Sequence, residues 1–193
     1  MKMTEGGFNI IRNSLGKLSQ SQVSEINYIV GEMDKDKSIT YPQGAYILAT
    51  TWHETAATML PITEFGNRKY FDKYDTGTLA KRLGNTQALD DDGFLYRGRG
   101  YVQITGKDNY IRVGKLIGVN LIVEPDLALN KTYAIKIMLG GMKNGWFTGK
   151  KLSDYIGKSN ADYVNARRII NGTDKAIQIA RYATIFEKAL RSY

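Results

Sequence analysis

Several residue types are scarce in this sequence, and each absence excludes a class of function. There are no cysteines, which excludes disulfide frameworks, thiol nucleophiles and cysteine-based zinc sites. His53 is the only histidine, so a metal centre built from several histidines is excluded as well. A Ser-His-Asp triad would have to use His53, and no Gly-x-Ser-x-Gly turn accompanies it. We therefore expect no metal and no other cofactor.

Long apolar runs are also lacking. Residues 1–8 contain no apolar stretch of the length found in signal peptides, and no run elsewhere approaches a membrane span. We therefore expect a chain without a signal peptide, which is made and folded in a cytosol and does not insert stably into a membrane. Any export would need help from another component.

The composition is that of a globular protein, with 193 residues that suffice for one domain with a core. Apolar residues recur at helical spacing in six segments, over residues 21–33, 42–60, 109–117, 133–142, 161–170 and 174–191. Residues 62–105 are irregular and rich in Gly, Asp and Tyr, with a small β element expected around Phe94–Tyr96. The pattern predicts one mostly helical domain with an irregular middle segment, and such segments often carry function.

Positive charge is concentrated at one end of the chain. Residues 131–193 contain 12 Lys/Arg and 4 Asp/Glu, whereas residues 1–130 contain 15 of each, so the last third holds the whole excess of +8. Such a segment favours a polyanionic partner: nucleic acid, an anionic membrane surface or an anionic cell envelope. The alternative is that these side chains only solvate helix faces. Residues 96–101 resemble basic-aromatic RNA-binding sequences, but no four-strand pattern surrounds them, and we expect no nucleic-acid partner.

One glutamate occupies a polar face of the helix predicted for residues 42–60. On a helical wheel the apolar residues form one stripe, and Glu54 lies nearly opposite it. The hydroxyl side chains of Thr50, Thr51 and Thr58 share its face. A single glutamate in such a place is usually an ordinary surface residue, so this position alone assigns no role.

A second glutamate lies beyond a proline. Because Pro61 disfavours helix in the residue before it, the helix should stop by Leu60, and the chain can turn back. Glu54 and Glu64 can then face each other across a groove. Inverting hydrolysis of a glycosidic bond needs such a pair, with carboxyl groups about 6.5–9.5 Å apart. The acids at 90–92 are rival second carboxylates, although three adjacent acids more often form a solvated loop.

Four motifs follow one another in the sequence: W-H-E-T at 52–55, Y-R-G-R-G-Y-V-Q-I-T at 96–105, N-Y at 109–110 and I-I-N-G at 169–172. Together they resemble glycoside hydrolase family 19, which contains the plant-type chitinases and, as a closer likeness, endolysins of bacteriophages. The resemblance runs from about Ala45 to Asn171. It implies a mainly α, lysozyme-like α+β fold. A single catalytic domain would span residues 1–193, with a small irregular or β segment forming one side of the substrate cleft.

The resemblance also implies catalytic roles. Glu54 matches the general acid of the family, and Glu64 matches the second carboxylate, which positions or deprotonates the attacking water. Thr105 matches the Ser/Thr whose hydroxyl helps to hold that water. We expect His53 to support the helix rather than to shuttle protons.

Further matches line the sugar cleft. The carboxamides of Gln103, Asn109 and Asn171 match groups that pair with N-acetyl and hydroxyl groups, and Tyr96 matches an aromatic residue beside the cleft. Gln103 lies two residues before Thr105 in a segment that we expect to be extended, so their side chains should share a side. We expect Arg99, in its Gly-Arg-Gly turn, to orient the carboxylates.

One departure separates this chain from the plant enzymes. Tyr101 stands where they usually carry proline, so contacts at that point of the cleft should differ. In its small size, its lack of cysteine and its lack of a secretion signal, the chain resembles the phage members of the family rather than the disulfide-bearing plant members.

These features together predict a phage endolysin of the muramidase type. It would hydrolyse the β-1,4 glycosidic bonds of peptidoglycan by a two-carboxylate inverting mechanism and so lyse the host cell. Peptidoglycan and chitin share N-acetylhexosamine chemistry, so the preference depends on the basic last third, because bacterial envelopes are anionic and chitin is nearly neutral. The alternatives are a chitinase, a lytic transglycosylase with one acid, or a non-catalytic module that binds wall or nucleic acid. We further expect a monomer that remains in the cytoplasm of the infected host until holin-type release.

Overall fold

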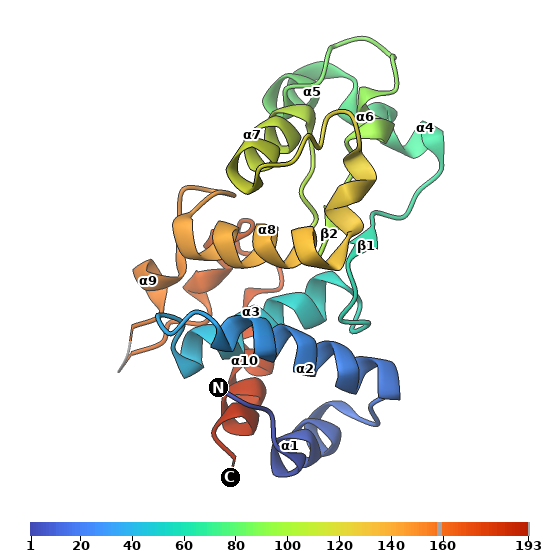
Figure 1. The fold of residues 1–193 in the computed structure, drawn as a ribbon. Helices are drawn as coiled ribbons and strands as arrows, with labels where there is room; N and C mark the ends of the chain where they lie inside the picture. The colour runs from blue at the N-terminus through green and yellow to red at the C-terminus, as the bar shows by residue number, and fades with distance from the viewer. Residues whose placement is uncertain (158–159, 193) are drawn as a thin grey trace. The chain divides into compact units, whose positions relative to one another are not determined.

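The computed structural model describes residues 1–157 and 160–192, and most of them are helical (Figure 1). Contacts divide the chain into two compact units. Unit 1 comprises Met1–Met59 and Leu139–Tyr193, and unit 2 comprises Leu60–Met138. Unit 1 is therefore discontinuous in sequence, and unit 2 is inserted between its two segments. The mainly helical fold class is confirmed, whereas a single catalytic domain stays a prediction.

Unit 1 is built around a buried helix, α3. Its elements are α1 (Glu5–Leu15), α2 (Gln20–Asp34), α3 (Tyr41–Glu54), the end of α8 (Lys131–Asn144), α9 (Leu152–Tyr155), the 3-10 helix η3 (Asn165–Ile169) and α10 (Ala176–Leu190). Ten of the 14 residues of α3 are buried, and α10 packs along it. Trp52 of α3 meets Phe186 of α10 edge to face, with ring centroids 6.0 Å apart.

The start of α3 follows from local sequence. The Thr40 hydroxyl accepts a hydrogen bond from Gln43 N, and the Gln43 side chain accepts one from Thr40 N, which forms the capping box that the sequence predicts. Pro42 lies in the first turn, where its missing N–H costs nothing.

The end of α3 differs from the prediction, because the helix stops at Glu54 rather than near Leu60. The Thr55 side chain competes with the helical hydrogen bonds: its hydroxyl donates to Thr51 O at 2.7 Å and accepts from Met59 N at 3.0 Å. Glu54 is therefore the last helical residue, and its carboxylate leaves from the end of the helix.

The turn after Glu54 contains three left-handed residues that are not glycine. Ala56, Ala57 and Met59 have φ angles of 49°, 65° and 60°. Each costs about 1–2 kcal/mol relative to a right-handed conformation. Contacts to the rest of unit 1 hold the turn in place, including a 2.8 Å hydrogen bond from Gln22 Nε2 to Ala57 O. Strained backbone conformations of this kind persist only where the surrounding structure holds them in place. They are found most often at functional sites.

Both ends of the chain belong to unit 1. Thr4 caps α1 by accepting from Gly7 N at 3.1 Å, and its hydroxyl donates to Ser192 O at 3.1 Å. Figure 1 shows the two termini close together beside α1 and α10. The sequence pattern does not predict α1, because glycines at positions 6 and 7 obscure it. Gly7 is required there, since a Cβ at this position would lie 2.6 Å from Ala189 O of α10.

Unit 2 combines short helices with a small sheet. Its elements are β1 (Ile62–Thr63), α4 (Arg68–Phe71), the 3-10 helix η1 (Asp72–Tyr74), α5 (Gly77–Leu83), α6 (Asp92–Leu95), β2 (Arg99–Gly100), α7 (Lys107–Ile117), the 3-10 helix η2 (Pro125–Leu129) and the first part of α8. The strands pair antiparallel, with Ile62 opposite Gly100 and Thr63 opposite Arg99.

Two sequence-based element predictions are wrong. The β element expected around Phe94–Tyr96 is helical at α6, and the strand lies a few residues later, at Arg99–Gly100. The helix expected over residues 161–170 is only the short η3, because the Asp162 carboxylate takes the Asn165 N–H in a tight turn. Within the described parts of the chain, no helix has the length and apolar character needed to cross a membrane.

Candidate functional site

Glu54 is paired with a buried arginine. Arg167 of η3 donates from Nη1 to Glu54 Oε1 in a close ion pair, and its Nε donates to the Asp174 carbonyl at 3.0 Å. The Arg167 side chain is 4% exposed and that of Glu54 is 16% exposed. Glu54 Oε2 has no hydrogen-bond partner among residues 1–157 and 160–192. One oxygen of this carboxyl group is thus fixed, and the other remains available to a ligand.

The hydroxyl groups expected around Glu54 are placed differently. Thr50 and Thr51 are fully buried, and the Thr51 hydroxyl donates to Ile47 O at 2.8 Å. Thr58 follows the end of α3 and does not share its surface. The prediction that these hydroxyl groups form a polar helix face is therefore wrong. The Thr51 hydroxyl donates a hydrogen bond to a backbone carbonyl within unit 1 instead of facing solvent.

His53 precedes Glu54 and is half-buried. Burial lowers the pKa of His53, the negative charge of Glu54 opposes that shift, and the positive charge of Arg167 adds to it. A neutral imidazole at physiological pH fits the supporting role expected for His53. The described residues contain no group of three or more acidic or histidine side chains that could hold a metal ion.

Glu64 follows β1 in unit 2, and hydrogen-bond donors reach both of its oxygens. The Tyr74 hydroxyl donates to Oε1 at 2.8 Å, and Gly98 N donates to Oε2 at 3.2 Å. Lys73 Nζ lies 3.9 Å from Oε1. Burial raises the pKa of Tyr74, and its hydrogen bond to Glu64 raises that pKa further. The Tyr74 hydroxyl therefore stays protonated and acts as the hydrogen-bond donor to Glu64. A carboxylate has about four acceptor positions, so room remains for a water.

Gly98 is held against Glu64 by its backbone. Glu64 N donates to Gly98 O at 2.7 Å, beside the contact between Gly98 N and the Glu64 carboxylate. A Cβ at position 98 would lie 3.2 Å from Glu64 Cβ and Oε2 and 2.8 Å from Gln103 Oε1. The first glycine of the Gly-Arg-Gly turn thus permits the close approach that positions Glu64.

Gln103 and Thr105 lie in a turn rather than in the extended segment expected for them. Gln103 has a left-handed φ of 56°, and its Nε2 donates to Ile62 O at 2.9 Å and to Gly100 O at 2.8 Å. The Thr105 hydroxyl donates to Gln103 O at 3.0 Å. The extended geometry is wrong because the Gln103 amide folds back to join β1 to β2. Roles for both side chains at a substrate stay predictions.

Arg99 does not contact Glu64, which corrects the expectation that it orients this carboxylate. Its guanidinium is buried and donates to Asp126 Oδ1 at 2.7 Å, to Leu95 O at 2.7 Å and to the Tyr110 hydroxyl at 2.9 Å. These partners surround the side chain because β2 packs against η2. Arg99 therefore joins β2 to α6, α7 and η2.

The other predicted contact residues are divided between the two units. Tyr96 is buried, and its ring packs against that of Tyr110 with centroids 5.4 Å apart. Asn109 is engaged in unit 2, where its Nδ2 donates to Thr105 O at 2.6 Å. Asn171 is exposed in unit 1, in the loop that Arg167 holds through Asp174.

The acids at 90–92 are not a uniformly solvated loop. Asp92 is buried, and Lys107 Nζ pairs with it at 3.1 Å. Asp90 accepts a hydrogen bond from the Thr86 hydroxyl, and Asp91 pairs with Arg68 at 2.8 Å. All three carboxylates thus have structural partners within unit 2.

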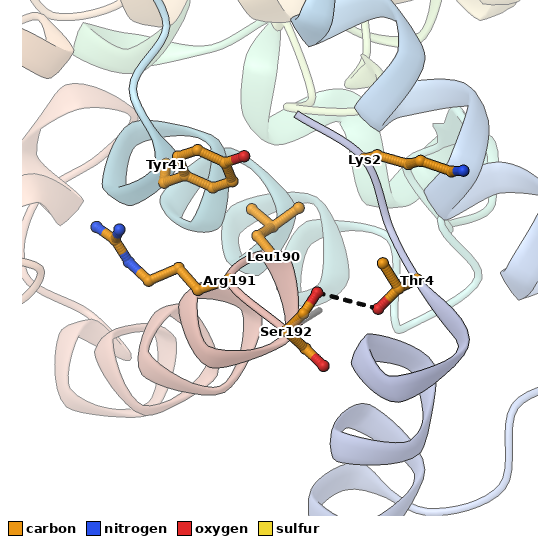
Figure 2. A pocket seen from close by; sticks show the side chains of 6 residues that line it. All are labelled: Lys2, Thr4, Tyr41, Leu190, Arg191 and Ser192. Carbon is orange, nitrogen blue, oxygen red and sulfur yellow. Dashed lines mark hydrogen bonds between the residues drawn. The ribbon is translucent and has the colours of Figure 1, made fainter.

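Two pockets lie apart from the carboxylates. One, of about 400 Å³, is formed where the chain ends meet, and it is lined by Lys2, Thr4, Tyr41, Leu190, Arg191 and Ser192 (Figure 2). Figure 2 shows the hydrogen bond between Thr4 and Ser192 at its edge. A larger one, of about 750 Å³, lies in unit 2 beside Arg99 and Asp126. Neither contains Glu54 or Glu64.

The partners of the two glutamates could not be found from sequence. Arg167 has an exposed neighbour, Arg168, and no local pattern distinguishes the buried arginine from the exposed one. Tyr74 is one of several tyrosines in the irregular segment. Both assignments depend on tertiary structure.

Known proteins provide a separate comparison. The family model described as class I chitinase matches residues 31–151, which is more than half of the chain. The chain belongs to glycoside hydrolase family 19. This family is the one that the four motifs predict.

One relative shares a short stretch with this family 19 chain. A glycosyl hydrolase family 19 domain-containing protein of Haemophilus influenzae is 47% identical over 57 residues, which cover 30% of this chain and 28% of that relative. The match therefore spans little more than a quarter of the length of that relative.

Solved structures share the family 19 fold. Chitinase C from Streptomyces griseus HUT6037 aligns with a TM-score of 0.65 and 20% identity, over 97% of this chain and 92% of that chain. A bacterial family 19 chitinase aligns with a TM-score of 0.54 and 19% identity, over 95% and 94% of the two chains. At these identities the likeness shows the fold alone, and it confirms the α-rich fold with a small sheet.

Proposed function

We propose that this family 19 hydrolase is a phage endolysin that cleaves the β-1,4 glycosidic bonds of bacterial peptidoglycan, with muramidase-type specificity. One observation carries the catalytic part: Glu54 has one oxygen fixed by a buried arginine and the other without a partner in the described chain. A carboxyl group held in this way can present a proton in a defined direction.

The two glutamates take different roles in the proposed reaction. Glu54 gives a proton through Oε2 to the leaving glycosidic oxygen, while Arg167 keeps the carboxyl group oriented. Glu64, positioned by Tyr74 and Gly98, takes a proton from the attacking water. The water adds to the face of the sugar opposite the leaving group, so the anomeric configuration is inverted.

The positive charge of the last third of the chain favours peptidoglycan over chitin as the substrate. The excess of +8 lies entirely in residues 131–193. Bacterial envelopes carry phosphates and peptide carboxylates, whereas chitin is nearly neutral, so long-range attraction concentrates the enzyme only at the former. This attraction should fall as salt is added. Release from an infected cell by a holin-type pore, and action as a monomer, form part of the same proposal.

A single substitution tests the catalytic assignment. Glu54→Gln keeps an oxygen that can accept from Arg167 but removes the proton, so release of reducing ends from purified peptidoglycan should stop. Thermal unfolding should show that the variant is still folded. Glu124→Gln, an exposed glutamate changed in the same way, should retain full activity. Full activity of Glu54→Gln would refute the assignment.

Chitin hydrolysis is the second candidate. The family model described as class I chitinase and the chitinase structures of the same fold favour it. The two functions are distinguished by turnover of N-acetylglucosamine oligomers against turnover of purified cell wall. Faster turnover of the neutral oligomers would favour the chitinase.

Mass spectrometry of the peptidoglycan products separates the remaining alternatives. Reducing N-acetylmuramic acid ends support a muramidase, and anhydro-muramyl ends indicate a lytic transglycosylase. Binding of cell wall without any new ends would indicate a non-catalytic module.

A further inference from the structure

An exposed aromatic and cationic surface adjoins Glu64. It is formed by Phe65, Tyr70 and Lys73 and is called here the 65–73 face. Phe65 is 98% exposed, Tyr70 is 46% exposed, and the side chain of Lys73 is 40% exposed. The Tyr70 ring lies over Gly66, where an added Cβ would come within 2.4 Å of it. The Tyr70 ring is therefore held next to the segment that carries Glu64, and Phe65 follows Glu64 directly in the chain.

The ammonium group of Lys73 has a fixed place on this face. Nζ lies 3.4 Å from the centroid of the Tyr70 ring and 4.6 Å from that of Tyr74. It also lies 3.9 Å from Glu64 Oε1. Cation–π attraction by two rings holds a side chain that would otherwise sample many rotamers. A positive charge is thus presented beside the carboxylate proposed to activate water, and it is still open to a ligand.

The surrounding charge is also positive. Residues 65–73 contain three basic side chains and one acid, Asp72. Arg68 is already paired with Asp91 at 2.8 Å, whereas no carboxylate in the described chain pairs with Lys69. A ligand that meets this face therefore finds aromatic surface in a segment that contains more basic than acidic side chains.

We propose that the 65–73 face binds the acid-bearing part of the glycan: an N-acetylhexosamine ring through Phe65 and Tyr70, and a carboxylate of the adjoining lactyl-peptide substituent through Lys73. Sugar C–H faces pack on aromatic rings, and an ammonium pairs with a carboxylate. A neutral glycan can use only the aromatic part. The inference rests on the proposed function and gives it a local basis for selectivity, separate from the long-range charge of residues 131–193.

The test compares two defined substrates. One is an oligosaccharide of alternating N-acetylglucosamine and N-acetylmuramic acid with its peptide stems, and the other is an N-acetylglucosamine oligomer of equal length. Lys73→Gln should lower the ratio of kcat/KM for the acidic over the neutral substrate about 3- to 5-fold, the worth of a partly exposed ion pair. Phe65→Ala should raise KM for both substrates and leave the ratio unchanged. Added salt should lower this ratio less in Lys73→Gln than in the wild type, because the variant lacks the local ion pair.

Lys81→Gln is the matched control, because Lys81 is an exposed lysine of α5 in the same unit. It should leave both values of kcat/KM unchanged. Equal losses on the two substrates in Lys73→Gln would overturn the inference, since Lys73 would then act only through Glu64, while the proposed function would stand. Cleavage of neither substrate by the wild type would refute the proposed function and this inference with it.

Discussion

Arg167 connects Glu54 to the loop before α10, because its Nη1 binds the carboxylate while its Nε binds the carbonyl of Asp174. One buried guanidinium thus holds the end of α3 and the segment that carries Asn171. A lysine could not replace it, since a single ammonium lacks the planar, forked geometry that reaches two acceptors in different directions.

Arg167→Gln should lower the free energy of unfolding by about 3 kcal/mol, because it leaves a partly buried carboxylate without its partner. Urea denaturation measures this loss. Arg168→Gln changes the exposed neighbouring arginine and should cost no more than about 0.5 kcal/mol. Similar losses in the two variants would show that the contact with Glu54 contributes little.

Tyr74→Phe should lower kcat about tenfold with little change in KM, because it removes a hydrogen bond to a charged group that positions Glu64. Steady-state kinetics on cell-wall glycan measures this effect. Tyr155→Phe, which removes a hydroxyl elsewhere, should have no effect on kcat. An unchanged kcat in Tyr74→Phe would mean that Gly98 and Lys73 suffice to hold Glu64.

His53 should titrate below its ordinary pKa of 6.5, because burial disfavours the charged imidazole. NMR can follow it without assignment, since the chain has one histidine. Well above its ordinary pKa the imidazole is neutral in both the folded and the unfolded chain. As the pH falls through that value, the unfolded chain takes up a proton before the native one does, so stability decreases.

The neighbours of His53 provide a check on this shift. Glu54→Gln should lower the pKa of His53 further, because it removes a negative charge, and Arg167→Gln should raise it. A wild-type pKa at or above the ordinary value of 6.5 would contradict the burial of this imidazole.

Ala57→Gly should stabilise the protein by as much as about 1 kcal/mol, because glycine removes the left-handed penalty while adding some entropy to the unfolded chain. Thermal or urea unfolding measures the gain. Ala180→Gly, in α10, should instead cost about 1 kcal/mol, as glycine does inside a helix. A loss of stability in both variants would indicate that the turn after Glu54 is not strained.

The parts of the fold that local sequence determines are predictable. The capping box of Thr40 and Gln43 fixes the start of α3, and helical spacing identifies α2, α7, α8 and α10. The end of α3 is not predictable in this way, because it depends on whether the Thr55 hydroxyl bonds back to Thr51 O and forward to Met59 N.

The candidate site is predictable as residue types and not as contacts. The four motifs identify the family, and the motif at 52–55 together with the turn at Pro61 singles out both glutamates. Their partners, Arg167 and Tyr74, come from segments whose approach depends on tertiary packing. The role expected for Arg99 fails for the same reason, since Asp126 and Tyr110 occupy its donors.

The insertion of unit 2 between the two segments of unit 1 has a consequence during synthesis. Unit 2 is continuous, so all of its chain has been synthesised before α10 is made. Helix α3 must therefore wait for α10, which packs along it from more than a hundred residues away, and the part of its apolar surface that α10 covers stays exposed until then. Contacts of such sequence separation form slowly, and uncovered apolar surface invites association. We expect the nascent chain to complete unit 2 first and to depend on chaperones at α3 until α10 has been made.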